Sequence, residues 1–241
     1  MAGHSKWANI KFRKAAQDAK RGKLFTKLIR EITVAARMGG EDLTINPRLR
    51  TSVDKALAAN MTRDIINRAI KRGAGNEAET DLEELSYEGY GPAGVAVMVE
   101  CLSNNRNRTA GEVRHAFSKF GGNLGTNGSV SYLFTNVGQI VVETPLEDEL
   151  TEYAIELGVN DIESYEPQIF MLETLAEDLF VIKQQLEKKS FKISFAEHTM
   201  LASVQVDLDN NDSIKVLKLL DALEDLDDVQ LVHSNANLSH G

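Results

Sequence analysis

The chain has little of what an extracellular or membrane protein needs. It has one cysteine, Cys101, in 241 residues, which excludes an intrachain disulfide and is typical of a reducing compartment. No apolar run approaches the length that crosses a bilayer, which excludes a transmembrane helix. The N-terminus has no apolar signal core. We therefore expect a soluble, cytoplasmic protein.

Sequence signatures of catalysis are also missing. There is no phosphate loop, no HExxH and no pair of CxxC motifs. Residues 207–211 imitate the start of a calcium loop, but Asp212 replaces the required Gly and Lys218 the required Glu, so the acids are expected to cap a helix instead. Cys101 lies in an apolar stretch, which favours a buried structural thiol over a nucleophile paired with His115. We expect no enzyme, no metal site, no cofactor and no small-molecule substrate.

Charge is divided unevenly along the chain. Up to Gly75 there are 17 Lys and Arg against 6 Asp and Glu, a net of +11, whereas the remainder has 10 against 30, a net of −20. The first thirty residues alone hold nine bases against one acid, Asp18, with Trp7 and Phe25 among them. Cations neutralise phosphate and aromatic faces stack on bases, while an acidic body repels nucleic acid and confines contact to the basic part. The pattern favours a polyanionic partner.

The basic part has the periodicity of three helices. An apolar stripe predicts a first helix over residues 23–37, and Asn46 with Pro47 predicts the cap and first position of a second. Thr62 can cap a third, which ends at residues 73–75. The short connection before Thr62 superficially resembles a helix-turn-helix, in which the third helix would read bases. Any helical hairpin has a short loop, so we favour phosphate contact by this helix.

Beyond an acidic linker at 76–81 the pattern alternates between strands and helices. Strands are expected at 94–102, 129–135, 138–143, 162–166, 168–173, 191–195, 204–208 and 229–233. Helices are expected to begin at capping boxes 109–112, 144–147 and 174–177, and to cover 212–224.

The order of these elements indicates how the domains are arranged. Residues 138–198 give βαββαβ, a complete ferredoxin-like unit, and the elements on either side make a second unit interrupted in its middle. We therefore expect an α+β protein in which an N-terminal three-helix domain (1–77) is followed by two ferredoxin-like α+β domains, one inserted in the other. The outer domain comprises 78–136 and 202–241, and the inserted domain 137–201. A single large sheet is the alternative.

Six stretches of the chain resemble the YebC/PmpR family, and together they span nearly its whole length. They are Gly3-His-Ser-Lys-Trp-Ala-Asn9, Lys14-Ala-Ala-Gln-Asp-Ala-Lys-Arg-Gly22, Asn46-Pro-Arg-Leu-Arg50, Tyr87-Glu-Gly-Tyr-Gly-Pro92, Asn105-Arg-Asn-Arg-Thr109 and Gly121-Gly-Asn-Leu-Gly125. The resemblance implies a helical domain followed by two α+β domains, and a cytoplasmic, probable transcriptional regulator that binds DNA. Mitochondrial relatives are translational activators and bacterial relatives are implicated in ribosome function. Phe12 stands where many relatives have His, so it is not taken as a site residue.

Two functions remain open: a DNA-binding regulator of transcription, and an RNA-contacting translation factor that docks on the ribosome. A third, an acidic adaptor whose basic end aids protein docking, is less favoured. The partner is expected to be nucleic acid, DNA or RNA, with the ribosome as a candidate and no membrane. The residues expected to contact it are Lys6, Trp7, Lys11, Arg13, Lys14, Lys20, Arg21, Lys23, Lys27, Arg30, Arg63, Lys71, Arg72, Arg106 and Arg108.

Two charged stretches allow more than one interpretation. Arg106 and Arg108 belong either to a polar turn that delivers Thr109 as a helix cap or to a phosphate site at that helix N-terminus. The acidic run Glu224-Asp-Leu-Asp-Asp228 is expected to be solvated, with a basic partner as the alternative.

Overall fold

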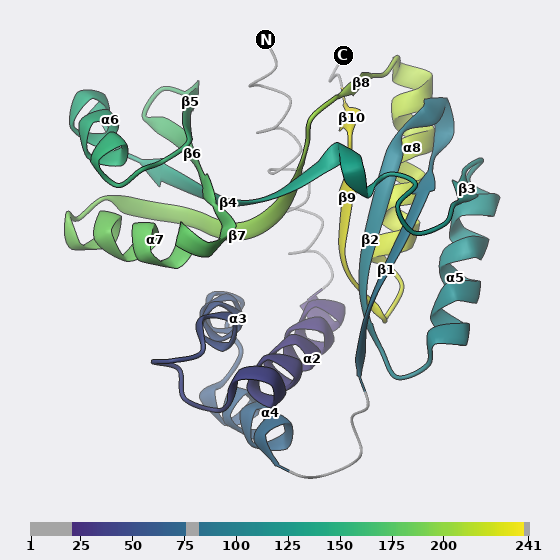
Figure 1. Ribbon diagram of the computed structural model, residues 1–241, viewed down its shortest axis with the longest axis horizontal. Helices are drawn as coiled ribbons and strands as arrows, with labels where there is room; N and C mark the ends of the chain where they lie inside the picture. Colours follow the sequence, from purple (N-terminus) through teal and green to yellow (C-terminus); the bar gives the residue numbers. More distant parts are fainter. Residues whose placement is uncertain (1–20, 76–81, 239–241) are drawn as a thin grey trace. The chain divides into compact units, whose positions relative to one another are not determined.

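The computed structural model describes residues 21–75 and 82–238 (Figure 1). Of these, 134–203 form one compact unit, and the residues before and after them form the other. The fold class is confirmed: an N-terminal helical domain is followed by two α+β domains, one inserted in the other. No helix within the described ranges is long and apolar enough to cross a bilayer.

The helical domain consists of α2 (Arg21–Gly39), α3 (Pro47–Ala58) and α4 (Arg63–Ala74). Its core is formed by Ile32, Leu49 and Ala56 with Ile66 and Ala69. Helices α2 and α4 approach closely at Gly73, where an added Cβ would lie 2.2 Å from the carbonyl oxygen of Thr33. The glycine therefore sets the distance between these two helices.

Asn46 fixes the entry into α3, as its position before Pro47 predicts. Its side-chain oxygen accepts a hydrogen bond from the Leu49 amide at 3.0 Å, which caps the helix. Its amide nitrogen donates to the carbonyl oxygens of Ala35 at 2.8 Å and Gly40 at 2.7 Å. One buried side chain thus ties the start of α3 to the end of α2.

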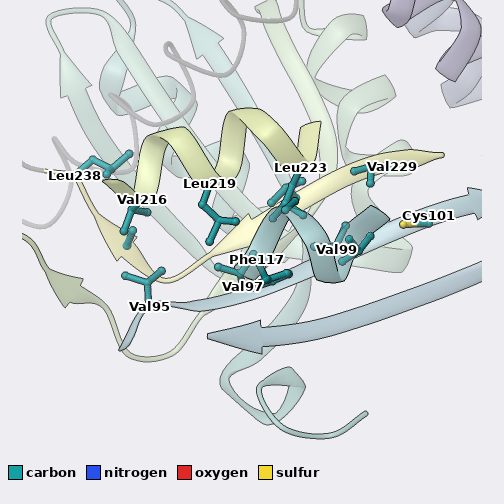
Figure 2. Packing of buried hydrophobic residues seen from close by; sticks show 14 of the residues in the cluster. Val95, Val97, Val99, Cys101, Phe117, Val216, Leu219, Leu223, Val229 and Leu238 are labelled. Carbon is teal, nitrogen blue, oxygen red and sulfur yellow. The ribbon is translucent and has the colours of Figure 1, made fainter. Parts of the chain in front are cut away.

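The outer α+β domain packs two helices on one face of a four-stranded antiparallel sheet. Its elements are β1 (Glu83–Tyr90), β2 (Ala96–Ser103), α5 (Arg106–Lys119) and β3 (Asn123–Leu124), then β8 (Val206–Asp207), α8 (Asn210–Glu224), β9 (Val229–Ser234) and β10 (Ala236–Asn237). The sheet order is β3-β1-β2-β9, and β8 pairs with β10 separately. Figure 2 shows Val97 and Val99 of β2 packing against Phe117 of α5 and Leu219 and Leu223 of α8.

One strand prediction for this domain is wrong, and one strand was not predicted. Strand β1 was not expected, and residues 129–135 do not form a strand of their own. Ser131–Leu133 is a 3-10 turn, and Phe134 already begins the next strand. The Glu88 carboxylate accepts hydrogen bonds from the amides of Gly128, Val130 and Ser131, each at 2.8 Å. Since these amides bind a side chain, they cannot join a strand ladder.

The inserted domain has the connectivity that residues 138–198 predict. It consists of β4 (Phe134–Glu143), α6 (Glu147–Glu156), β5 (Asp161–Glu166), β6 (Ile169–Leu175), α7 (Leu179–Lys188) and β7 (Lys192–Ala202). The sheet order β5-β6-β4-β7 places the first and third strands of the unit side by side at its centre, which is the ferredoxin-like arrangement. Helices α6 and α7 cover one face, with a core that includes Ile140, Leu150, Leu172 and Leu186 (Figure 1).

The three predicted capping boxes are wrong. Helix α5 begins at Arg106 and is capped by Asn105, which accepts from the Arg108 amide at 3.0 Å, so Thr109 lies inside the helix. The Thr144 hydroxyl accepts from the Leu146 amide before α6 begins, and Thr174 lies within β6. A threonine three residues before an acid does not specify whether the preceding strand has ended. The cap assigned to the acids at 207–212 is confirmed, because Asp209 accepts from the Asp212 amide at 2.8 Å.

Candidate nucleic-acid interface

Part of the expected interface lies outside the described residues. This part comprises Lys6, Trp7, Lys11, Arg13, Lys14 and Lys20, and the side chain of Arg21 joins them. The other eight predicted residues belong to α2, α4 and the first turn of α5.

Helix α4 presents cations to solvent. Ile66, Ala69 and Ile70 face the helical core, so the opposite side of the helix is exposed. Arg63 and Lys71 lie eight residues apart on this side, with Arg72 beside Lys71, and all three are exposed. Within the described part of the chain, none of the three forms an ion pair or a side-chain hydrogen bond. Their charge is therefore available to a ligand. We call Arg63, Lys71 and Arg72 the α4 cations.

Helix α2 uses its cations differently. Lys23, Lys27 and Arg30 lie on one side of the helix, and all three contact the C-terminal end of α8 or the residues that follow it. The Lys23 ammonium donates to the Asp225 carbonyl at 2.7 Å, and the Lys27 ammonium to the Glu224 carbonyl at 2.8 Å. The last carbonyls of a helix lack intrahelical partners and carry partial negative charge, so they bind cations. We call Lys23, Lys27 and Arg30 the α2 cations.

Asp228 is the buried centre of this contact. Its carboxyl side chain is 2% exposed. One oxygen accepts from Arg30 at 2.9 Å, and the other accepts from Arg108 at 2.6 Å, Thr109 at 2.7 Å and Ser103 at 2.9 Å. The network joins α2 to the end of β2, to the first turn of α5 and to the segment before β9.

The donors to Asp228 decide its charge state. Burial alone would raise the pKa of the Asp228 carboxyl, but the hydrogen bonds from Arg108, Thr109 and Ser103 outweigh it and hold the pKa below its usual value. Asp228 is therefore ionised at neutral pH. The expectation that the acidic run 224–228 is solvated is wrong for Asp228, and its basic partner lies within the same chain.

The two arginines at the N-terminus of α5 have different environments in the structure. Arg108 donates to Asp228 and, at 3.2 Å, to the side-chain oxygen of Asn104. The Arg106 side chain is 71% exposed, 3.9 Å from the Glu83 carboxylate. Arg108 thus contributes to the fold, whereas Arg106 keeps its guanidinium in solvent. Neither Asp228 nor Glu88 is apparent from local sequence, because each acts on residues at least forty positions away.

The cysteine has the environment of a structural residue. Cys101 is 3% exposed in the core of the outer domain, and burial raises the pKa of its thiol to about 12. The thiolate that a nucleophile requires is therefore strongly disfavoured. Among residues 21–75 and 82–238, no three His, Cys, Asp or Glu side chains gather in a way that could hold a metal ion.

Comparison with known proteins agrees with this domain order. Residues 5–76 match the model of the TACO1/YebC protein N-terminal domain, and residues 82–236 match that of the TACO1/YebC second and third domain. A protein from Haemophilus ducreyi is 58% identical to this chain over 239 residues, and one from Histophilus somni strain 2336 is 59% identical over 239 residues. In both cases the aligned region covers 99% of this chain and 97% of the relative. Each is named a probable transcriptional regulatory protein.

A solved structure also matches. The crystal structure of a conserved hypothetical protein from Aquifex aeolicus is 48% identical in sequence, covers 93% of each chain and superposes with a TM-score of 0.83. The family models, the relatives and this structure together cover both the helical domain and the two α+β domains. The chain therefore belongs to the TACO1/YebC family.

Proposed function

We propose that this protein is a nucleic-acid-binding regulator of gene expression that acts on DNA as a regulator of transcription. The observation that carries the proposal is the exposed side of α4, where Arg63, Lys71 and Arg72 have no partner within the described residues. Lys and Arg side chains that neutralise phosphates release condensed counterions, which supplies sequence-independent affinity. The names of the Haemophilus and Histophilus relatives support the regulatory role.

Helix α4 is suited to positioning on the phosphate backbone. Its exposed side holds the α4 cations together with Arg68, whose guanidinium pairs with Asp64. Asn67 is the one exposed amide in this helix, and amides are the side chains that read adenine edges. A surface dominated by cations contacts phosphate, which fixes orientation without reading sequence. We therefore propose that α4 binds the backbone and that base reading by this helix is minor.

The basic N-terminal stretch extends the proposed contact. Residues 6–21 carry six bases and Trp7, and an aromatic ring can stack on an unpaired base. The α2 cations are removed from the proposed interface, since they bind the end of α8 and the Asp228 network. Their proposed role is to hold the helical domain on the outer domain, so that the exposed side of α4 is presented in a fixed orientation.

The salt dependence of binding tests this proposal. We compare the wild type with the triple variant Arg63→Gln, Lys71→Gln and Arg72→Gln on duplex DNA and on single-stranded RNA. If each α4 cation neutralises one phosphate, the slope of log affinity against log salt should flatten by about 2.7 on duplex DNA or about 2.1 on a single strand. Affinity should fall to a similar degree for unrelated sequences.

The matched control is the triple variant Lys188→Gln, Lys189→Gln and Lys218→Gln, which removes the same charge from exposed positions elsewhere. It should leave the slope nearly unchanged. An equal flattening in both variants would show only a response to net charge and would contradict a role for α4. Tighter binding to RNA, with the α4 effect confined to RNA, would overturn the DNA assignment in favour of a translation factor.

A further inference from the structure

The inserted sheet has a second face, which points away from α6 and α7. Side chains alternate between the two faces of a strand. Ile140 and Leu172 lie in the core beneath the helices, so Gln139 and Val141 of β4 and Met171 of β6 belong to the opposite face. This second face combines acidic and apolar side chains in an ordered pattern.

The strand register places carboxylates in adjacent rows. One row runs across all four strands as Asp161, Glu173, Gln139 and Glu197. The next row contains Glu163, Met171, Val141 and Phe195. Like charges directly opposite each other on neighbouring strands are destabilising, and Asp161 stands opposite Glu173. Lys192 pairs with a further carboxylate, Glu143, at the end of the same strands.

The middle of this face is apolar and buried. Val141 is 0% exposed, and Tyr165 and Met171 are 4% exposed, although they do not face the α6 and α7 core. Tyr165 and Met171 form a small apolar cluster of their own, with the partly buried Phe195 packed against it. The Tyr165 hydroxyl donates to Glu163, and burial together with the neighbouring carboxylates raises the pKa of Tyr165. An aromatic or aliphatic group flanked by cations would fit such a surface.

We propose that this acidic face, formed by Asp161, Glu163, Glu173 and Glu197 around Val141, Tyr165, Met171 and Phe195, binds residues 1–20 of the same chain. The segment carries five bases, Lys6, Lys11, Arg13, Lys14 and Lys20, against Asp18 alone, together with Trp7, Ile10 and Phe12. Its cations complement the carboxylates, and its apolar groups complement the buried centre. Aromatic rings also make favourable contacts with a methionine sulfur such as that of Met171.

Covalent attachment favours this occupant over a second molecule. A tethered segment meets its site at an effective concentration in the millimolar range, so a contact too weak to form between separate chains is still occupied. An acidic face repels nucleic acid, which excludes the phosphate backbone as a direct ligand. The contact is therefore intramolecular, and its strength should fall with added salt.

One consequence rests on the proposed function. A base that neutralises a carboxylate of the acidic face cannot at the same time neutralise a phosphate. Nucleic acid must then displace residues 1–20 from the inserted domain before they contribute to binding. The acidic face would act as an internal competitor, and removing its charge should tighten nucleic-acid binding.

The only tryptophan of the chain, Trp7, makes the proposal measurable without nucleic acid. In the full-length protein at low salt we expect a short-wavelength emission maximum and weak acrylamide quenching, because the indole lies on an apolar surface. The variant Glu163→Gln, Glu173→Gln and Glu197→Gln should shift the emission to longer wavelength and increase quenching. High salt should have the same effect on the wild type and little further effect on this variant.

The control Glu149→Gln, Glu152→Gln and Glu156→Gln neutralises three exposed carboxylates of α6 in the same domain and should leave Trp7 emission unchanged. A second test leaves the sheet intact: changing the five bases of residues 1–20 to Gln should shift the emission as the acidic-face variant does. Solvent-exposed emission in the wild type, or equal shifts in the acidic-face variant and the control, would overturn the proposal. So would an emission that changes on dilution, which would identify a second copy as the occupant.

Discussion

The α2 cations and the α4 cations are alike in composition and belong to the same small domain, yet the fold uses them in opposite ways. Lys23, Lys27 and Arg30 reach carbonyl and carboxylate oxygens near the end of α8. Arg63 and Lys71 meet no partner within the described residues. A basic cluster is therefore not by itself a binding site. Only cations that have no carbonyl or carboxylate partner in the fold remain available to a ligand.

The largest effect should come from removing the centre of the α2 contact. The substitution Asp228→Ala leaves Arg30 and Arg108 without their carboxylate, and breaking such a buried network costs about 3 kcal/mol of unfolding free energy. Chemical denaturation measures this loss. Asp227 is the matched control because its side chain is exposed and only its backbone carbonyl contacts Arg30. Asp227→Ala should change stability by less than about 0.5 kcal/mol, and equal losses in the two variants would contradict the network.

The same carboxylate predicts a pH dependence. The pKa of Asp228 is lowered in the folded state, so its contribution to stability is present above the unfolded pKa of about 3.9 and is lost as pH falls through the folded pKa. The melting temperature of the wild type should therefore drop below about pH 4. Asp228→Asn keeps the shape of the side chain without its charge. The melting temperature of this variant should be lower than that of the wild type at neutral pH, and it should decrease less steeply as the pH falls below about 4. Parallel curves for the two proteins would show that Asp228 does not carry the effect.

The N-terminal bases should affect binding more than folding. If these five bases each neutralise one phosphate, they contribute roughly −4.5 to the slope of log affinity against log salt on duplex DNA, or about −3.5 on a single strand, in addition to the contribution of the α4 cations. Changing Lys11, Arg13, Lys14, Lys20 and Arg21 to Gln should remove most of that contribution and weaken binding to all sequences alike. Titrations at several salt concentrations check this, with thermal melting as the control for folding. An unchanged slope would assign these bases to another partner.

The smallest effect on the salt slope is expected from Arg68, which shares features of both the α2 cations and the α4 cations. It belongs to α4, but its guanidinium pairs with Asp64 one turn earlier, and both side chains are about 70% exposed. An exposed pair of this kind contributes about 0.5 kcal/mol or less to stability. Because Asp64 already neutralises part of its charge, Arg68→Gln should flatten the salt slope less than Arg63→Gln. A larger effect from Arg68→Gln would show that the Asp64 pair opens on binding.

Local sequence was sufficient where neighbouring residues determine the structure. The Asn46 cap, the three helices and the βαββαβ order of the inserted domain all follow from spacings within a few residues. Predictions failed where a distant group intervenes. Glu88 holds the amides at 128–131 in a turn, and the acceptors of the α2 cations lie about 200 residues further along the chain. No local pattern distinguishes Lys27, which is engaged, from Lys71, which is available.

The most direct test compares the two sets of cations in one experiment. The variants Lys23→Gln, Lys27→Gln and Arg30→Gln on α2, and Arg63→Gln, Lys71→Gln and Arg72→Gln on α4, remove the same charge. Each is measured for melting temperature and for the salt slope of nucleic-acid binding. We predict that the α2 variant melts earlier and keeps its slope, whereas the α4 variant keeps its melting temperature and loses slope. A flattened salt slope with an unchanged melting temperature in the α2 variant would contradict the account. So would a lowered melting temperature with an unchanged salt slope in the α4 variant.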